Sequence, residues 1–395
     1  MLIIKSKRKR ALGLNEPLRH ESHKKPVTRR DFLAQGFTTG AATVIAPAAI
    51  GAMMNPRLAS ATLPQALRDQ CKITSAVSGR VPFICFDLAG GANIAGSNVL
   101  VGKEGGQLDF LSTQGYSKQG LPGNMLPNNA TTNFVNTEFG LAFHSDSAFL
   151  RGMIEKTSVT TRAFVNGAVI AARSENDTGN NPHNPMYGLA RYGLRGSLLT
   201  LVGSQNSESG GNSMAPAMLI DPSNRPTKID RASDVTGLVD TGEVATILSA
   251  DDTVKTLESM YRLSNQKMDR VSTGLPAPGA DAEVEQGFKC AYVKTADTVE
   301  RFNNPAELNP AADQDITRIF GANFGGDGEF QKTAAVMKLV VEGKAGAGTV
   351  SMGGFDYHTG DRSTGELRDL RAGRCIGACL EFAAANNAPL MIYVF

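Results

Sequence analysis

The chain has 395 residues, with 40 Lys and Arg against 38 Asp and Glu and a net charge of +2. The basic excess lies in residues 1–61, which hold 11 Lys and Arg and 3 Asp and Glu. The remainder therefore has 29 basic and 35 acidic residues, which argues against a nucleic-acid-binding body because phosphate binding needs a basic field. Its length suffices for one large domain or two modest ones.

Residues 1–61 have the pattern of a twin-arginine export signal. The segment 28–33 reads Thr-Arg-Arg-Asp-Phe-Leu, a weakly hydrophobic run spans 36–54, and 58–61 offers a small-x-small cleavage site. A membrane anchor is the alternative, but Pro47 and the many Gly and Thr residues argue against a stable span of ~20 apolar residues. We expect transport by the twin-arginine export machinery to the periplasm or beyond, with no membrane span after cleavage.

The cysteines form no Cys-x-x-Cys or zinc-type motif. An exported protein can form disulfides, but an odd number of cysteines leaves at least one free. We expect most of them to be buried as small apolar residues. They are Cys71, Cys85, Cys290, Cys375 and Cys379.

The nearly continuous apolar run at 81–86 predicts a strand buried on both faces. Asp87 stands at its end, followed by Gly90-Gly91 and Asn93. A carboxylate at this place is either a functional group at the carboxyl end of a strand or a helix-capping aspartate. Residues 100–140 are rich in Gly, Asn, Ser and Pro and predict an excursion over the sheet.

A helix at 145–156 and a second strand at 162–172 are predicted next, and a densely polar segment, 174–185, follows. The functional interpretation makes Thr178 or Ser174 a nucleophile and His183 a ligand or an acid. Asn181 and His183 are candidates for binding an anionic substrate near a helix N-terminus. The alternative is a solvated loop built from asparagine turns.

The middle of the chain predicts a third strand at 198–202 and no nucleophile elbow. Amphipathic helices at 243–270 and 281–303 predict a helical insertion of about 240–305. A helix at 330–342 is followed by a predicted turn at 343–348. Its glycines precede a strand, whereas a dinucleotide fingerprint follows one, so a Rossmann site is rejected.

The strand that ends in Gly353-Gly354 carries the strongest candidate site. Asp356 and His358 are two apart on an extended segment and point to the same side, as two metal ligands or an acid–base pair must. A helix beginning near residue 363 and a strand at 389–395 complete a predicted parallel βαβ unit. Ligands of open α/β sheets bind beyond the carboxyl ends of such strands.

These segments together resemble the DUF1501 family, exported bacterial proteins of the alkaline phosphatase/sulfatase superfamily. The resemblance covers most of residues 62–395 and is carried by the leader, by Phe86 to Asn93, and by Gly353-Gly354-Phe355-Asp356-Tyr357-His358. It implies a three-layer α/β/α sandwich with a mostly parallel sheet and a metal-dependent site for phosphate or sulfate esters. The metal ligands it implies are Asp87, Asp356 and His358, and Thr178 is a much looser match to the superfamily's Ser/Thr nucleophile.

The family pattern has two further elements, resembling Ser-Glu-Phe-Gly-Arg and Thr-Asp-His-Gly, which this sequence does not contain. We therefore expect a domain at 62–395 that is incomplete at its C-terminus. Three ligands are too few for two metals, so the expected cofactor is a single divalent ion (Zn, Mn, Ca or Mg) or none.

Two functions remain open: a periplasmic metal-dependent hydrolase of small anionic esters, and a non-catalytic exported binding or secretion-associated protein that keeps the fold. A metal-free serine hydrolase is poorly supported, because residues 62–395 hold only His144, His183 and His358 as candidate bases.

Overall fold

A computed structural model gives the structure of the chain. It describes residues 65–71, 73, 80–129, 131–170, 184–204, 226–239, 247–268, 270, 272, 279–302, 305–356, 360 and 362–395. The predicted export signal at 1–61 lies outside these residues. The chain divides into two compact units, one of which holds Leu248–Ala296 and the other Gln65–Ile247 with Asp297–Phe395.

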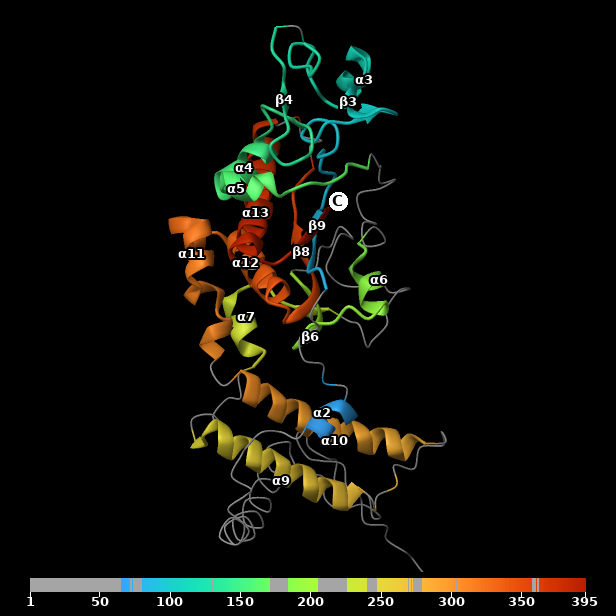
Figure 1. Cartoon of the computed structure of the whole chain (residues 1–395), viewed down its shortest axis with the longest axis vertical. Helices are drawn as coiled ribbons and strands as arrows, with labels where there is room; N and C mark the ends of the chain where they lie inside the picture. Colours follow the sequence, from blue (N-terminus) through green and yellow to red (C-terminus); the bar gives the residue numbers. More distant parts are fainter. Residues whose placement is uncertain are drawn as a thin grey trace, which may run out of the picture. The chain divides into compact units, whose positions relative to one another are not determined.

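The larger unit is built on a five-stranded parallel sheet with the strand order β7-β6-β8-β1-β9 (Figure 1). Its strands are β1 (Phe83–Leu88), β6 (Leu199–Gly203), β7 (Thr227–Lys228), β8 (Ala345–Met352) and β9 (Met391–Val394). The sheet confirms an α/β fold. Helix α13 (Arg362–Ala385) connects β8 to β9 and confirms the predicted parallel βαβ unit, with β1 between its two strands.

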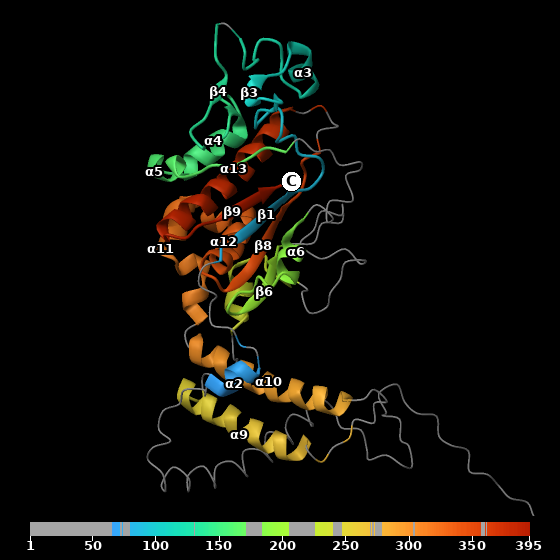
Figure 2. The same ribbon diagram turned by 45° about the vertical axis from the view of Figure 1, so that its right-hand side comes forward.

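Helices cover both faces of the sheet. Helices α4 (Ala148–Lys156), α12 (Gly328–Val341) and α13 lie on one face, and α6 (Met186–Arg191) lies on the other (Figures 1 and 2). Strand β1 sends Ile84 and Phe86 into the large core on the first side and Phe83 and Cys85 into a smaller core with α6. Because side chains alternate along a strand, Asp87 follows Cys85 on the α6 face.

The remaining elements of this unit are short. They are α2 (Gln65–Gln70), β2 (Gly102–Lys103), β3 (Gly106–Phe110), α3 (Thr113–Lys118), β4 (Val135–Asn136), β5 (Phe143–His144), α5 (Val159–Ala163), α7 (Ala232–Gly237), α11 (Gln314–Phe320) and the 3-10 helices η5 (Pro305–Leu308), η6 (Pro310–Ala312) and η7 (Gly321–Gly326). The excursion predicted at 100–140 lies beyond the carboxyl end of β1 and contains an antiparallel pair, β2–β3, that the sequence did not predict (Figure 2).

The strand predicted at 162–172 is wrong for its described residues. The chain forms helix α5 there and then runs to residue 170 without strand structure. The Glu381 carboxylate from α13 accepts a hydrogen bond from Thr161 Oγ1 at 2.6 Å and holds this turn of helix. Phe164 is 86% exposed, so the apolar run that suggested a strand is not buried as a unit.

The turn predicted at 343–348 is also shorter than expected, because β8 already begins at its third residue. Gly346 and Gly348 belong to the strand. A Cβ atom at Gly346 would lie 2.7 Å from Leu194 O, and one at Gly348 would lie 2.6 Å from Val336 Cγ1. These glycines therefore allow close packing of the strand against its neighbours.

Two long helices, α9 (Ala250–Met268) and α10 (Ala280–Arg301), occupy the places predicted for them at 243–270 and 281–303. Most of their residues fall within Leu248–Ala296, the second unit. Across the residues that the structure describes, no helix is long and apolar enough to cross a membrane.

Three of the cysteines are free thiols, and all three are buried: Cys85, Cys375 and Cys379. Burial raises the pKa of the Cys375 thiol to about 12, and it also raises the pKa of the other two. A thiol that stays protonated is a poor nucleophile and a poor metal ligand. The expectation that most cysteines are buried as small apolar residues is confirmed for these three.

Helices α4 and α13 approach each other through glycines. A Cβ atom at Gly373 would lie 2.0 Å from Phe149 O, and one at Gly152 would lie 2.2 Å from Leu370 O. No real Cβ atom tolerates such distances to backbone. The two backbones can therefore pack this closely only because neither position has a side chain.

Replacing Gly373 by Ala is expected to lower the free energy of unfolding by about 1–3 kcal/mol, the usual cost of overpacking. The loss would exceed the gain of about 1 kcal/mol that Ala brings to a helix interior. Gly188→Ala in α6 is the control, because a Cβ atom there would have no neighbour within 4 Å. Urea unfolding of both variants measures the difference, and a Gly373→Ala protein as stable as Gly188→Ala would contradict the close packing.

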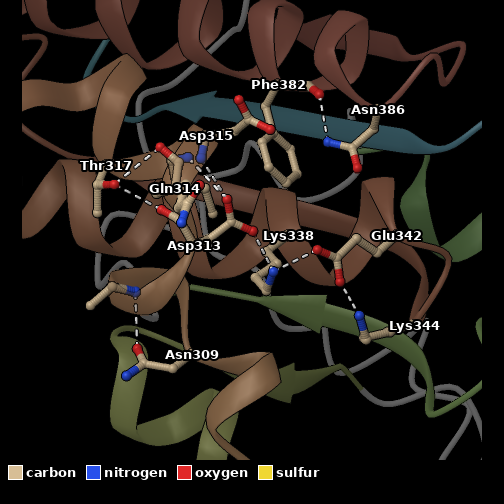
Figure 3. A network of polar contacts seen from close by, with 12 residues as sticks. Asn309, Asp313, Gln314, Asp315, Thr317, Lys338, Glu342, Lys344, Phe382 and Asn386 are labelled. Carbon is tan, nitrogen blue, oxygen red and sulfur yellow. Dashed lines mark hydrogen bonds and ion pairs between the residues drawn. The ribbon is translucent and has the colours of Figure 1, made fainter.

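A buried ion network lies at the amino end of β8 (Figure 3). Lys338 of α12 is 4% exposed and donates to Asp313 Oδ2 at 2.5 Å and to Glu342 Oε1 at 2.6 Å. Glu342 also pairs with Lys344, directly before β8. Asp313 uses its other oxygen to cap α11, accepting from the backbone amides of Asp315 and Ile316. One lysine thus connects α11, α12 and the start of the central strand.

Candidate functional site

Asp87 and Ser351 form the centre of the candidate site. They are register partners in the neighbouring strands β1 and β8, although they lie 264 residues apart in the chain. Ser351 Oγ donates to Asp87 Oδ2 at 2.8 Å. Asp87 is 0% exposed, and its Oδ1 has no hydrogen-bond partner among the described residues. A buried carboxylate oxygen without a partner is rare and calls for an explanation.

Burial raises the pKa of Asp87 to about 6, although the hydrogen bond from Ser351 acts in the opposite direction. The charged carboxylate is therefore present at pH 7 but poorly solvated. A nearby positive charge would favour this charged form. A bound cation would therefore stabilise the charged form of Asp87.

Ser351 is held in place from several directions. Its amide N–H donates to Ser204 Oγ at 2.7 Å, and its carbonyl oxygen accepts from Lys332 Nζ at 2.6 Å. Lys332 comes from α12 on the opposite face of the sheet and pairs with Glu329 at 2.8 Å. The hydroxyl that orients Asp87 therefore belongs to a residue whose backbone is fixed by its neighbours on both sides.

The two glycine turns singled out in the sequence lie side by side. Phe355 N donates to Ala89 O at 3.1 Å, and a Cβ atom at Gly90 would lie 3.1 Å from Asp356 N. Gly90 has φ +114°, a conformation that favours glycine, so a side chain there would be strained as well as crowded. Asp356, a half-buried residue, thus follows a turn that packs directly on the loop after Asp87.

The structure brings Asp87 and Asp356 to the same edge of the sheet, as the parallel strands predicted. His358, Thr178, Asn181 and His183 lie outside the described residues, so their predicted roles stay predictions. Over the part of the chain that is described, no group of three or more His, Cys, Asp or Glu side chains could hold a metal ion. The looser match at Thr178 depended on a preceding strand, and the described residues 162–170 do not form one.

Asn184 shows where the polar segment returns to the sheet. Its Oδ1 accepts from the Cys85 thiol at 3.1 Å and from Met186 N at 2.9 Å, and its Nδ2 donates to Thr349 Oγ1 at 2.8 Å. Cys85 and Thr349 lie two residues before Asp87 and Ser351 in their strands. Asn184 is therefore on the same face of the sheet as the candidate site.

A polar cavity of about 480 Å³ opens beside the first glycine turn. Its floor is a satisfied buried network, in which Asn98 Nδ2 donates to Asp369 Oδ2 at 3.0 Å and Ser147 Oγ donates to Asn98 Oδ1 at 2.6 Å. The residues that line it include Asn93, Asn98, His144, Asp146, Glu366 and Asp369.

His144, one of the three candidate bases, has a structural role. Its Nε2 lies 2.8 Å from Met125 O, and its Nδ1 accepts from Asp146 N at 3.3 Å. The ring also stacks on Phe134, with centroids 5.2 Å apart. With both ring nitrogens occupied, His144 is not poised to act as a base.

Three residues of the candidate site were not predicted from the sequence: Ser204, Lys332 and Ser351. A faint signal existed for Ser351, because Thr349 and Ser351 are polar and two apart in an otherwise apolar or small-residue strand. Lys332 lies between Gln331 and Thr333 near the start of its helix and is 6% exposed. Neither observation identifies a partner without the register of the sheet.

The comparisons with known proteins give no relative: no family model, no curated protein and no solved structure matches the chain.

Proposed function

We propose that the chain is an exported protein that binds a divalent cation at Asp87 and hydrolyses phosphate or sulfate esters at the carboxyl edge of the sheet. The observation that carries this proposal is the fully buried Asp87 carboxylate, whose Oδ1 has no partner among the described residues. The raised pKa of this group supports it, because a bound cation would offset the cost of the buried charge.

The buried Asp87 Oδ1, which has no partner among the described residues, suits such a cation. Asp87 and Asp356 offer carboxylate oxygens, which suit Mg²⁺, Mn²⁺ and Ca²⁺. His358, which the resemblance adds as a ligand, would extend the range to Zn²⁺. When bound, the cation supplies Lewis-acid polarisation of a phosphoryl or sulfuryl oxygen.

The chain's own groups would orient the reaction. Ser351, fixed by Ser204 and Lys332, holds the Asp87 carboxylate through a hydrogen bond to one oxygen and leaves the other for the ligand. The polar cavity beside Asn93 has room for the alcohol part of a small ester. We place the nucleophile at Thr178 and substrate contacts at Asn181 and His183, supported by the position of Asn184 on the face of Asp87.

The finer description of the fold belongs to this proposal. The large helical layer on one face of the parallel sheet and α6 on the other support an alkaline phosphatase-like three-layer sandwich with a helical insertion. The leader at 1–61 supports export by the twin-arginine machinery and a periplasmic or secreted location.

Calorimetric titration of the full chain with Mg²⁺, Mn²⁺, Ca²⁺ and Zn²⁺, followed by assays with an aryl phosphate and an aryl sulfate, tests the proposal. We expect saturable binding of at least one cation and turnover that depends on it. Asp356→Ala should weaken binding at least about tenfold, since even outer-shell partners of metals contribute 10–100-fold. Asp315→Ala, on an exposed part of α11, is the matched control and should change nothing.

The outcomes separate the two functions. A chain that binds no cation at millimolar concentrations is not the proposed hydrolase. Cation binding without turnover of either ester would favour the alternative, a non-catalytic exported binding protein that keeps the fold.

A further inference from the structure

The arginines of α13 differ in their partners. Three of them form ion pairs: Arg362 with Glu366 at 2.5 Å, Arg371 with Asp327 at 3.3 Å, and Arg374 with Glu155 at 2.6 Å. Arg368, the fourth, has no hydrogen bond or ion pair in the part of the chain that the structure describes. It is half-buried, so its guanidinium is neither fully hydrated nor neutralised by a carboxylate.

The guanidinium of Arg368 lies against the second glycine turn. A Cβ atom at Gly354 would lie 2.7 Å from Arg368 Cζ and 2.8 Å from Nη1. Gly354 also has φ +87°, which disfavours any residue with a side chain. Glycine at this position therefore forms the turn. It also lets the Arg368 guanidinium approach the backbone directly before Phe355 and Asp356.

The same turn offers further donors. Gly353 and Gly354 are exposed residues, and their backbone N–H groups donate no hydrogen bond within the described residues. Phe355 N, by contrast, is bound to Ala89 O, which anchors the turn to the loop after Asp87. The turn at the edge of the candidate site therefore has two amide donors of its own and the Arg368 guanidinium beside it.

We propose that Arg368 and the Gly353–Gly354 turn form an oxyanion site that binds a phosphate or sulfate group. A guanidinium presents paired N–H donors that match two oxygens of such a group, and successive backbone amides in a turn with positive φ form anion-binding concavities. The assignment of this site to the anionic group of an ester substrate rests on the proposed hydrolase. Binding of a free anion requires neither a cation nor turnover.

The test is calorimetric titration of the full chain with inorganic phosphate and, separately, inorganic sulfate, in EDTA at pH 8. We expect saturable binding by the wild type and at least tenfold weaker binding by Arg368→Gln. Arg368→Lys keeps the charge but loses the planar fork, so we expect an intermediate loss. Arg371→Gln, three residues further along the same helix and already paired with Asp327, is the matched control and should bind within twofold of the wild type.

A second variant changes the glycine turn of the same site instead of the arginine. Gly354→Ala should displace the guanidinium and weaken phosphate binding as Arg368→Gln does, with circular dichroism and the melting temperature confirming that both variants are folded. The relative affinity for phosphate and sulfate identifies which ester the site prefers.

The inference is overturned if the wild type binds neither anion at millimolar concentrations, or if Arg368→Gln and Arg368→Lys both bind like the wild type. Anion binding that appears only with added cation and is unchanged in Arg368→Gln also overturns it. If the wild type binds the anion but no cation, and Arg368→Gln loses anion binding, the oxyanion site is supported and the proposed hydrolase is rejected.

Discussion

Replacing Asp87 by Asn is expected to make the metal-free protein more stable at pH 8 and to abolish the stabilisation by a divalent cation. The pKa of Asp87 is raised from 3.8 to about 6 by burial. A shift of about two units corresponds to about 3 kcal/mol, which the charged carboxylate costs the folded state above pH 6. Asn has nearly the same shape and carries no charge, so it removes that cost together with the ligand.

The pH dependence follows from the direction of the shift. Because the folded state holds the Asp87 proton more tightly than the unfolded state, its stability falls as the pH rises from about 4 to about 6. Below this window the carboxyl is neutral in both states, and above it the full cost is present. The advantage of Asp87→Asn should therefore be near zero at pH 4 and reach up to about 3 kcal/mol at pH 7–8.

Urea unfolding in EDTA at several pH values measures this advantage, and the same experiment with cation measures the loss of binding. A ligand present at 100 times its dissociation constant stabilises the wild type by about 2.7 kcal/mol and should leave Asp87→Asn unchanged. Asp315→Asn removes a half-exposed carboxylate and is the control at every pH. An Asp87→Asn protein that is less stable at pH 8, or that still gains stability from the cation, would contradict the role of this carboxylate.

The elements that frame the site were predictable because each has a strong local signal. The run at 81–86 is continuous enough to indicate a buried strand, whereas the last apolar segment, also predicted as a buried strand, forms the edge strand β9 and is only partly buried. The long helix between the strand before Gly353 and β9 imposes a parallel arrangement. Parallel strands place their carboxyl ends at one edge, but the pairing of β1 with β8 that brings the Asp87 and Asp356 loops together was not predicted from the sequence.

The groups that tune the site were not predictable for the opposite reason. The bond between Ser351 and Asp87 depends on the register of two strands 264 residues apart, and a single serine in a strand has no periodic signature. The approach of Arg368 depends on the positive φ of Gly354, which a Gly-Gly pair permits but does not require. The false strand at 162–172 has a similar cause, because the contact from Glu381 that holds α5 comes from a distant helix.

Lys338→Met is expected to have a large effect on stability, a loss of about 3–5 kcal/mol, because it leaves two carboxylates without their shared cation. The Lys338 side chain is 5% exposed, whereas those of Asp313 and Glu342 are 16% and 19% exposed. Burial alone would raise the pKa of Asp313, but the bond from Lys338 and backbone amides hold it below its ordinary value. The wild type therefore has a contribution to stability that is present above pH 4 and is lost on acidification, and the variant lacks it.

Lys344→Met is the matched control at the edge of the same network. Burial, together with the neighbouring charge of Lys338, lowers the pKa of Lys344 to about 8, so its charge is poorly accommodated despite its pairing with Glu342. Its removal should cost clearly less than that of Lys338, because Glu342 keeps its bond from Lys338. A triple variant, Lys338→Met with Asp313→Asn and Glu342→Gln, should recover much of the loss, since neutral replacements of a buried ion network are often tolerated.

The distance between the ion network and the candidate site allows the effect of Lys338→Met on stability to be separated from any effect on binding. Lys344 directly precedes β8, and Asp356 follows its other end, so the eight residues of the strand separate the two sites by roughly 25 Å at about 3.3 Å per residue. Lys338→Met should therefore reduce stability in urea unfolding while leaving the affinity for cation and phosphate at the wild-type value below the unfolding transition. A Lys338→Met protein within about 0.5 kcal/mol of the wild type, the range of ordinary surface substitutions, would mean that this buried network does not stabilise the fold.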